Sequence, residues 1–156
     1  MLKLRLPVLA ALCACAVSFV FAQDEKPKSD PAKPQASVAS KTAKFGTVKL
    51  GDGSVKTALK ATDLAGAKKL VDKDGAFEGV VVKVFSPSSN GLVILNFDKN
   101  YRNALTAVLR VKNYASFPYM QTLKGKHVLI TGKFVDYKGS TEIQLTKPDQ
   151  VKLIAE

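Results

Sequence analysis

The sequence of 156 residues contains no tryptophan, one histidine and only two cysteines. Both cysteines, Cys13 and Cys15, lie among the first 22 residues, so the rest of the chain can form no disulfide within itself and has no thiolate chemistry. His127 consequently has no cysteine partner for a zinc site, and a catalytic triad would need other bases nearby. From these shortages we expect no catalytic residue, no metal and no cofactor.

Acidic residues are also scarce, with 13 Asp and Glu against 24 Lys and Arg and a formal net charge of +11. Such an excess favours contact with a polyanion or an anionic surface. Residues 61–156, however, hold 14 basic and 9 acidic side chains, which is less than half of the net charge. The total charge therefore supports polyanion binding only weakly. The positions of individual cations are the better indication of a binding surface.

Residues 1–22 have the layout of a cleavable secretory signal. Lys3 and Arg5 precede an apolar run, and Ala22 ends it just before polar residues. The alternative is a transmembrane anchor, which needs about 20 apolar residues, and this run is shorter. We therefore expect cleavage before Gln23 and export of a mature protein, without a membrane span, to the periplasm or the extracellular space.

The next two segments precede the main domain. Residues 23–44 are rich in Pro, Ser, Ala and Lys, a composition that buries too little apolar surface to fold and predicts a disordered linker. Residues 45–61 hold an Asp-Gly pair between short alternating stretches, which predicts a β-hairpin. We place the folded domain at residues 62–156.

Strand patterns dominate this domain. Five principal strands are predicted, at residues 76–85, 92–97, 105–112, 126–135 and 141–145. A short helix is predicted before the first strand and a helical or irregular piece between the third and fourth. This order favours an all-β fold with a minor helix, a small five-stranded antiparallel barrel of the oligonucleotide/oligosaccharide-binding (OB) type.

The residues of the domain also carry a family resemblance, over about residues 62–154. The matching positions are Leu95, Asn96, Phe97, Tyr101, Asn103, the stretch 123–126, the strand 128–132, Tyr137, Lys138, Gly139, Glu142 and Ile143. In these positions the chain resembles nucleic-acid-binding OB domains of the anticodon-binding and helicase type, in versions found on secreted bacterial proteins. The resemblance implies a barrel whose ligand loop lies between the fourth and fifth strands.

Strand alternation assigns side chains to the two faces of the sheet. In the third strand it predicts one core face and one outward face: Leu105, Ala107, Leu109 and Val111 inside, and Thr106, Val108, Arg110 and Lys112 outside. In the fourth strand Lys133 falls on the face opposite the core. By burial preference we also expect five phenylalanines in the core: Phe77, Phe85, Phe97, Phe117 and Phe134.

Single-strand binding by such a barrel needs a cationic groove for phosphates and exposed rings on which bases stack. The tyrosines are the candidates for stacking, although each could instead pack at the barrel rim: Tyr101, Tyr114, Tyr119 and Tyr137. The predicted nucleic-acid-binding residues are Tyr101, Arg102, Arg110, Lys112, Lys133, Tyr137 and Lys138.

These features favour an exported, non-enzymatic OB module that binds single-stranded DNA or RNA mainly through the backbone. The alternative is a periplasmic OB domain that binds a protein, a peptide or a small envelope ligand, with the positive charge serving solubility or attraction to the envelope. Export favours this alternative, because nucleic acid is scarcer outside the cytoplasm. Fold resemblance does not choose between them.

Overall fold

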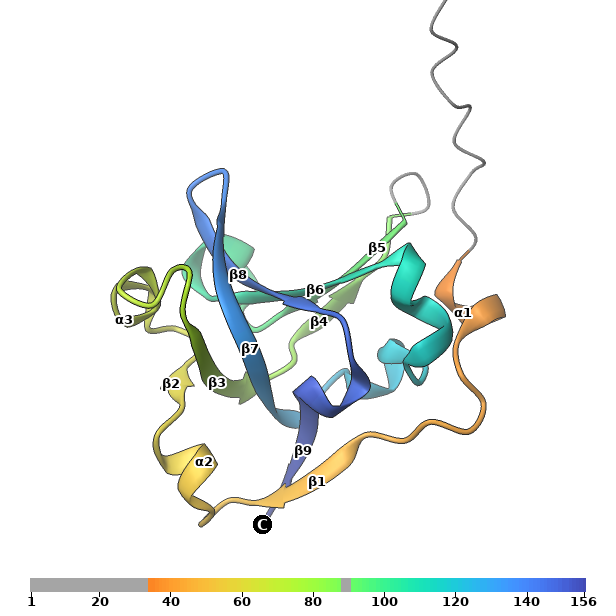
Figure 1. The fold of residues 1–156 in the computed structure, drawn as a ribbon, viewed down its shortest axis with the longest axis horizontal. Coiled ribbons are helices and arrows are strands. Elements are labelled where there is room, and N and C mark those ends of the chain that lie inside the picture. Colours follow the sequence, from red (N-terminus) through yellow and green to blue (C-terminus); the bar gives the residue numbers. More distant parts are fainter. Residues whose placement is uncertain (1–33, 88–90) are drawn as a thin grey trace, which may run out of the picture.

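The computed structural model of the protein describes residues 34–87 and 91–156 (Figure 1). The predicted signal peptide, residues 1–22, and the first part of the predicted linker, residues 23–33, lie outside the described residues. Within the described ranges, no helix combines the length and apolar character that crossing a membrane requires.

The described chain is mostly β-structure with short helices between the strands (Figure 1). The strands are β1 (Gly46–Lys49), β2 (Leu59–Lys60), β3 (Asp74–Val80), β4 (Lys83–Phe85), β5 (Leu92–Asn96), β6 (Thr106–Arg110), β7 (His127–Tyr137), β8 (Ser140–Leu145) and β9 (Val151–Ala155). The α-helices are α1 (Gln35–Val38), α2 (Gly53–Lys56) and α3 (Leu64–Lys68). The 3₁₀ helices are η1 (Tyr101–Asn103), η2 (Val111–Ser116), η3 (Met120–Leu123) and η4 (Pro148–Gln150).

Strand pairing curls the sheet so that the last strand of the series, β4, directly follows the first, β3, in the chain. β3 pairs antiparallel with β7, β7 with β8, β8 runs parallel to β6, β6 pairs antiparallel with β5, and β5 with β4. β4 continues β3 across Val81 and Val82. The amide of Val81 donates to the carbonyl of Lys126 at 2.9 Å, whereas that of Val82 donates to the carbonyl of Asn96 at 2.9 Å. This curled arrangement is OB-like.

The bend at Val81 and Val82 explains part of a difference from the predicted strand count. The predicted strand 76–85 is split into β3 and β4, because its two halves bond to different partner strands. β1, β2 and β9 add further strands, so the described chain has nine in place of five. The single helical piece predicted between the third and fourth strands is two 3₁₀ helices, η2 and η3, with Pro118 between them. Proline has no amide hydrogen with which to continue the first helix.

The hairpin predicted over residues 45–61 is wrong. β1 pairs in parallel with the C-terminal strand β9, and the two run together in Figure 1. The Asp-Gly pair begins helix α2 instead, because the Asp52 side chain accepts a 2.8 Å hydrogen bond from the amide of Ser54. Aspartate serves turns and helix caps equally well, so the pair alone could not distinguish the two.

The disordered linker predicted over residues 23–44 is wrong for its last part, residues 34–44, which pack on the domain. Gln35 is only 3% exposed. Its side chain donates to the carbonyl of Pro118 at 2.9 Å and accepts from the amide of Met120 at 3.0 Å. The side-chain amide of Gln35 thus satisfies backbone groups of Pro118 and Met120. The average composition of residues 23–44 does not reveal such a single specific contact.

One hydrophobic core fills the curled sheet. Four of the five predicted core phenylalanines are buried there: Phe77, Phe97, Phe117 and Phe134. The rings of Phe77 and Phe97 meet edge to face with centroids 5.1 Å apart. Phe85 contradicts the prediction, since it is 43% exposed on β4 beyond the bend. Val111 is also exposed, because the chain leaves β6 for η2 at that residue.

Candidate functional site

A groove of about 580 Å³ runs over β5, β6 and β8, and we call it the β5–β6 groove. Its lining includes an apolar strip on β5 and β6, which we call the floor, and exposed aromatic and cationic side chains, which we call the rim. The lining residues are Phe85, Leu92, Ile94, Asn96, Tyr101, Arg102, Ala104, Thr106, Val108, Arg110, Tyr137, Lys138, Ser140 and Glu142.

Strand alternation places the floor, as the sequence predicts. On β6, Ala107 and Leu109 are buried in the core, so the outward set of Thr106, Val108 and Arg110 lines the groove. On β5 the same alternation turns Leu92, Ile94 and Asn96 to the groove. Ile94 and Val108 are partners in the ladder, so two apolar side chains lie together in the floor.

Three exposed rings stand at the rim, each beside a cation. The Arg102 guanidinium carbon lies 5.6 Å from the centroid of the Tyr101 ring, and Lys138 Nζ lies 5.4 Å from that of Tyr137. Lys83 Nζ is 5.2 Å from the centroid of Phe85. Tyr101, Tyr137 and Phe85 are 53%, 50% and 43% exposed. Rings next to cations can stack a planar group and neutralise an anion at the same place.

The turn between β7 and β8 sets the position of one of these rings. Lys138 and Gly139 have φ angles of +53° and +83°, the two positive values of a type I′ hairpin turn. The Gly139 amide donates to Asp136 Oδ1 at 3.1 Å and fixes the turn from inside. Tyr137 and Lys138 therefore stand at the tip of the β7–β8 hairpin, which projects from the body of the molecule (Figure 1).

Five of the seven predicted binding residues line the groove: Tyr101, Arg102, Arg110, Tyr137 and Lys138. Lys133 does not, because this part of β7 pairs with β3, and its Nζ lies 3.3 Å from Asp72 Oδ1. β7 changes its pairing partner from β3 to β8 one residue later. Alternation predicted the face of β7 on which Lys133 lies, but it could not predict which strand lies beside it. Lys112 lies in η2 beyond the end of β6 and is also outside the groove.

The remaining tyrosine candidates are placed elsewhere. Tyr114 is buried in the core, so a stacking role for it is wrong, and Tyr119 is exposed but lies outside the groove. The sequence interpretation missed Phe85 and Glu142 as groove residues. Val84 is buried and Phe85 follows it, so alternation extended from Val84 would have turned Phe85 outward.

Glu142 is a buried carboxylate inside this cationic groove. It is 6% exposed, and its Oε1 accepts from Gln144 Nε2 at 3.4 Å. Burial raises the pKa of Glu142, an effect only partly offset by the Gln144 hydrogen bond and the charge of Arg110. Among the described residues it forms no ion pair.

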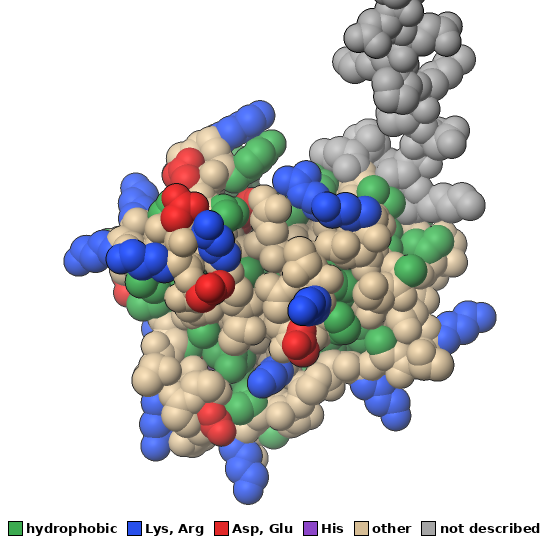
Figure 2. Space-filling model, viewed as in Figure 1, with side chains coloured by type: hydrophobic (Ala, Val, Ile, Leu, Met, Phe, Trp, Pro, Cys, Tyr) green, Lys and Arg blue, Asp and Glu red, His purple; other side chains and the backbone are tan. Residues whose placement is uncertain are grey.

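The charge of Arg110 acts on Glu142, but the groove cations likewise lack an ion pair among the described residues. Within residues 34–87 and 91–156, Arg102, Arg110 and Lys138 form no ion pair. Elsewhere basic side chains are scattered over the surface with acidic ones between them, as Figure 2 shows for one face. No group of three or more His, Asp or Glu side chains in the described part of the chain is arranged to hold a metal ion. Local placement, more than overall charge, distinguishes the groove.

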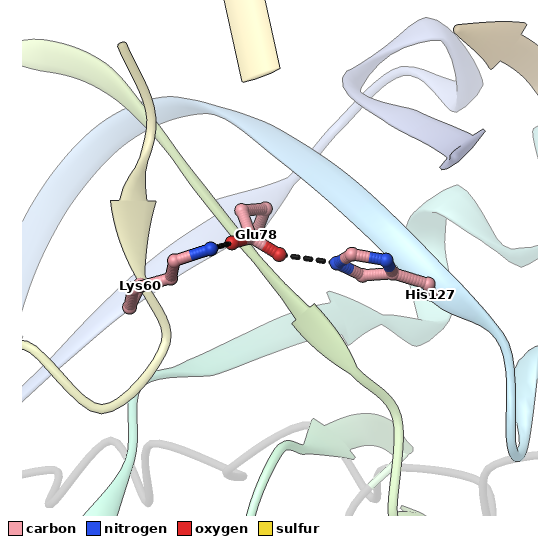
Figure 3. A network of polar contacts seen from close by, with 3 residues as sticks. All are labelled: Lys60, Glu78 and His127. Atoms are coloured by element: carbon pink, nitrogen blue, oxygen red, sulfur yellow. Dashed lines mark hydrogen bonds and ion pairs between the residues drawn. The ribbon is translucent and has the colours of Figure 1, made fainter. Parts of the chain in front are cut away.

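A second buried carboxylate, Glu78, lies on the outer face of β3, opposite the core residue Phe77. It is 3% exposed and bonds both to Lys60 from β2 and to His127 from β7 (Figure 3). Burial acts to raise the pKa of Glu78, but these two partners outweigh burial and lower it. The cluster joins three strands and leaves no carboxylate oxygen unpaired, so we assign it a structural role.

Comparisons with known proteins give only distant likenesses. No protein-family model matches the sequence, and no curated protein matches it. Among solved structures the chain is similar to an aspartyl-tRNA synthetase from Entamoeba histolytica, with a TM-score of 0.49 and 16% identity over 75% of this chain and 26% of that one. It is also similar to the hypothetical protein ygiW from E. coli, with a TM-score of 0.40 and 16% identity over 71% of this chain and all of that one. The chain thus spans about a quarter of the synthetase, and the OB-like assignment rests on the strand pairing.

Proposed function

We propose that the protein is a non-enzymatic module that binds single-stranded nucleic acid in the β5–β6 groove. The observation that carries the proposal is the rim, where Phe85, Tyr101 and Tyr137 are exposed rings beside cations around an apolar floor. β5 and β6 are the second and third strands of the OB order, the face on which OB folds bind oligonucleotides and oligosaccharides. The signal-like residues 1–22 support action outside the cytoplasm.

Two kinds of contact would share the work. Bases would stack on the rim rings, and each stacked base contributes about 1–3 kcal/mol in single-strand binders. Phosphates would lie against Arg102, Arg110 and Lys138 and release counterions, so that affinity falls with salt. The part of β6 that lines the groove, from Thr106 to Arg110, is roughly 13 Å long at about 3.3 Å per residue, so the groove can hold only a short stretch of nucleic acid.

A salt titration tests this function. Fluorescence anisotropy of labelled single-stranded DNA and RNA should show affinity that falls steeply with salt and that exceeds affinity for the corresponding duplex. Arg110→Gln should weaken binding and reduce the salt slope by about 1. Lys133→Gln is the matched control, because it removes the same charge outside the groove and should leave the slope unchanged.

Two outcomes would refute the proposal. Binding that hardly changes with salt would exclude a phosphate groove. Equal losses of affinity from Arg110→Gln and Lys133→Gln would show that general charge alone attracts the strand.

The second candidate is binding of a peptide or another small envelope ligand. Glu142 favours it, since a buried carboxylate in the groove can accept hydrogen bonds from an amine or a guanidinium. Saturable binding of a basic peptide that Glu142→Gln abolishes, together with no binding of single strands, would decide for this candidate.

A further inference from the structure

Glu142 has no part in phosphate binding, yet it lies in the groove proposed to bind nucleic acid. Its one hydrogen bond among the described residues, from Gln144, is 3.4 Å long and therefore weak. A buried carboxylate without an ion pair lowers folding stability, and its raised pKa reflects that penalty. Stability therefore does not explain the presence of a carboxylate here, and a ligand that donates to it would.

The surroundings of Glu142 decide which part of a strand would meet it. Phosphate is repelled by the carboxylate, so the backbone would stay at the cationic rim and a base would occupy this position. Tyr137 pairs with Ser140 across the hairpin, and Ser140 is two residues from Glu142 on the same face, about 7 Å along β8. The edge of a base stacked on Tyr137 can therefore reach the carboxylate.

We propose that Glu142 is a specificity-determining residue that selects bases with an exocyclic amino group over uracil and thymine. An ionised carboxylate only accepts hydrogen bonds, and adenine, cytosine and guanine each offer an amino donor. Uracil and thymine present two carbonyl acceptors on either side of their one N–H, and these oxygens repel the carboxylate. The inference rests on the proposed function and adds the class of base to it.

The test compares oligocytidylate with oligouridylate RNA of equal length, because the two bases have the same ring size and differ at the amino and carbonyl positions. Anisotropy titrations at one salt concentration should show about tenfold tighter binding of the cytidine strand. Glu142→Gln should remove most of this difference, chiefly by strengthening binding of the uridine strand. Asp149→Asn, an exposed position outside the groove with the same charge change, should keep the preference.

The outcomes separate this inference from the proposed function. Salt-dependent binding of both strands with equal affinity, or a cytidine preference that persists in a folded Glu142→Gln variant, overturns the role of Glu142 and leaves the proposed function standing. No binding of either strand overturns both. Circular dichroism of each variant confirms that it is folded before its affinity is interpreted.

Discussion

Two buried carboxylates on the same curled sheet behave in opposite ways. Glu78, on the outer face of β3, bonds to Lys60 and His127, and its pKa is lowered. Glu142, in the β5–β6 groove, has no ion pair among the described residues, and its pKa is raised. They are similarly exposed, at 3% and 6%, so surface exposure alone does not separate them. Their partners differ: Glu78 bonds to Lys60 and His127, whereas Glu142 has only a weak hydrogen bond from Gln144 and the charge of Arg110.

The largest effect on stability should come from Glu78→Ala. The substitution removes the bonds to Lys60 and His127, and we expect the free energy of unfolding to fall by about 2–3 kcal/mol. Urea denaturation measures it, while the affinity of the groove for a single strand should stay unchanged. A loss below about 0.5 kcal/mol would show that the Glu78 cluster is not structural and would remove one side of the comparison.

Tyr137→Ala should have the next largest effect, on the groove alone. Loss of one stacking surface should weaken single-strand binding by about 1–3 kcal/mol without changing the salt slope, because no charge is removed. Tyr119→Ala is the matched control, since Tyr119 is similarly exposed but lies outside the groove. Equal effects of the two substitutions would show that single strands do not bind specifically in the groove.

The pH dependence of stability should differ in sign between the two carboxylates. The pKa of Glu142 is raised above the ordinary 4.5, so its contribution to stability is present below pH 4.5 and lost as pH rises through the folded pKa. Glu142→Gln should therefore stabilise the protein by about 1 kcal/mol at neutral pH and by nothing below pH 4.5. Thermal denaturation across pH checks this.

Glu78 should show the reverse trend in the same experiment. Its folded pKa lies below 4.5, so its stabilisation is present above pH 4.5 and is lost as pH falls through the folded pKa. Glu78→Gln should be less stable than the natural protein at neutral pH, and the gap should close in acid. Parallel curves for the two variants would contradict the assigned partners.

The smallest effect should come from Lys133→Gln. The pair with Asp72 is mostly exposed, so we expect a loss below about 0.5 kcal/mol in the free energy of unfolding. Urea denaturation measures it. A larger loss would mean that charge pairs on the outer face of β7 stabilise the fold beyond the contribution of Glu78.

The sequence indicated most of the groove, but not all of it. Periodicity of two turned Thr106, Val108 and Arg110 outward, and the turn signal around Gly139 located the hairpin. Glu142 escaped notice as a groove residue because its burial depends on neighbours that are distant in sequence. Lys133 was assigned to the groove because periodicity gives the side of a strand and not the strand beside it.

By itself, the sequence determined the alternation of core and outward residues, the OB-like order of the main strands and the scarcity of cysteine and histidine, because these depend on local spacing and residue type. Only the tertiary structure decided that β1 pairs with β9, that Gln35 is anchored on the domain, and that Glu78 bonds to Lys60 and His127 while Glu142 forms no ion pair among the described residues. Such outcomes depend on contacts between residues far apart in the chain, and on the burial and charge that those contacts create.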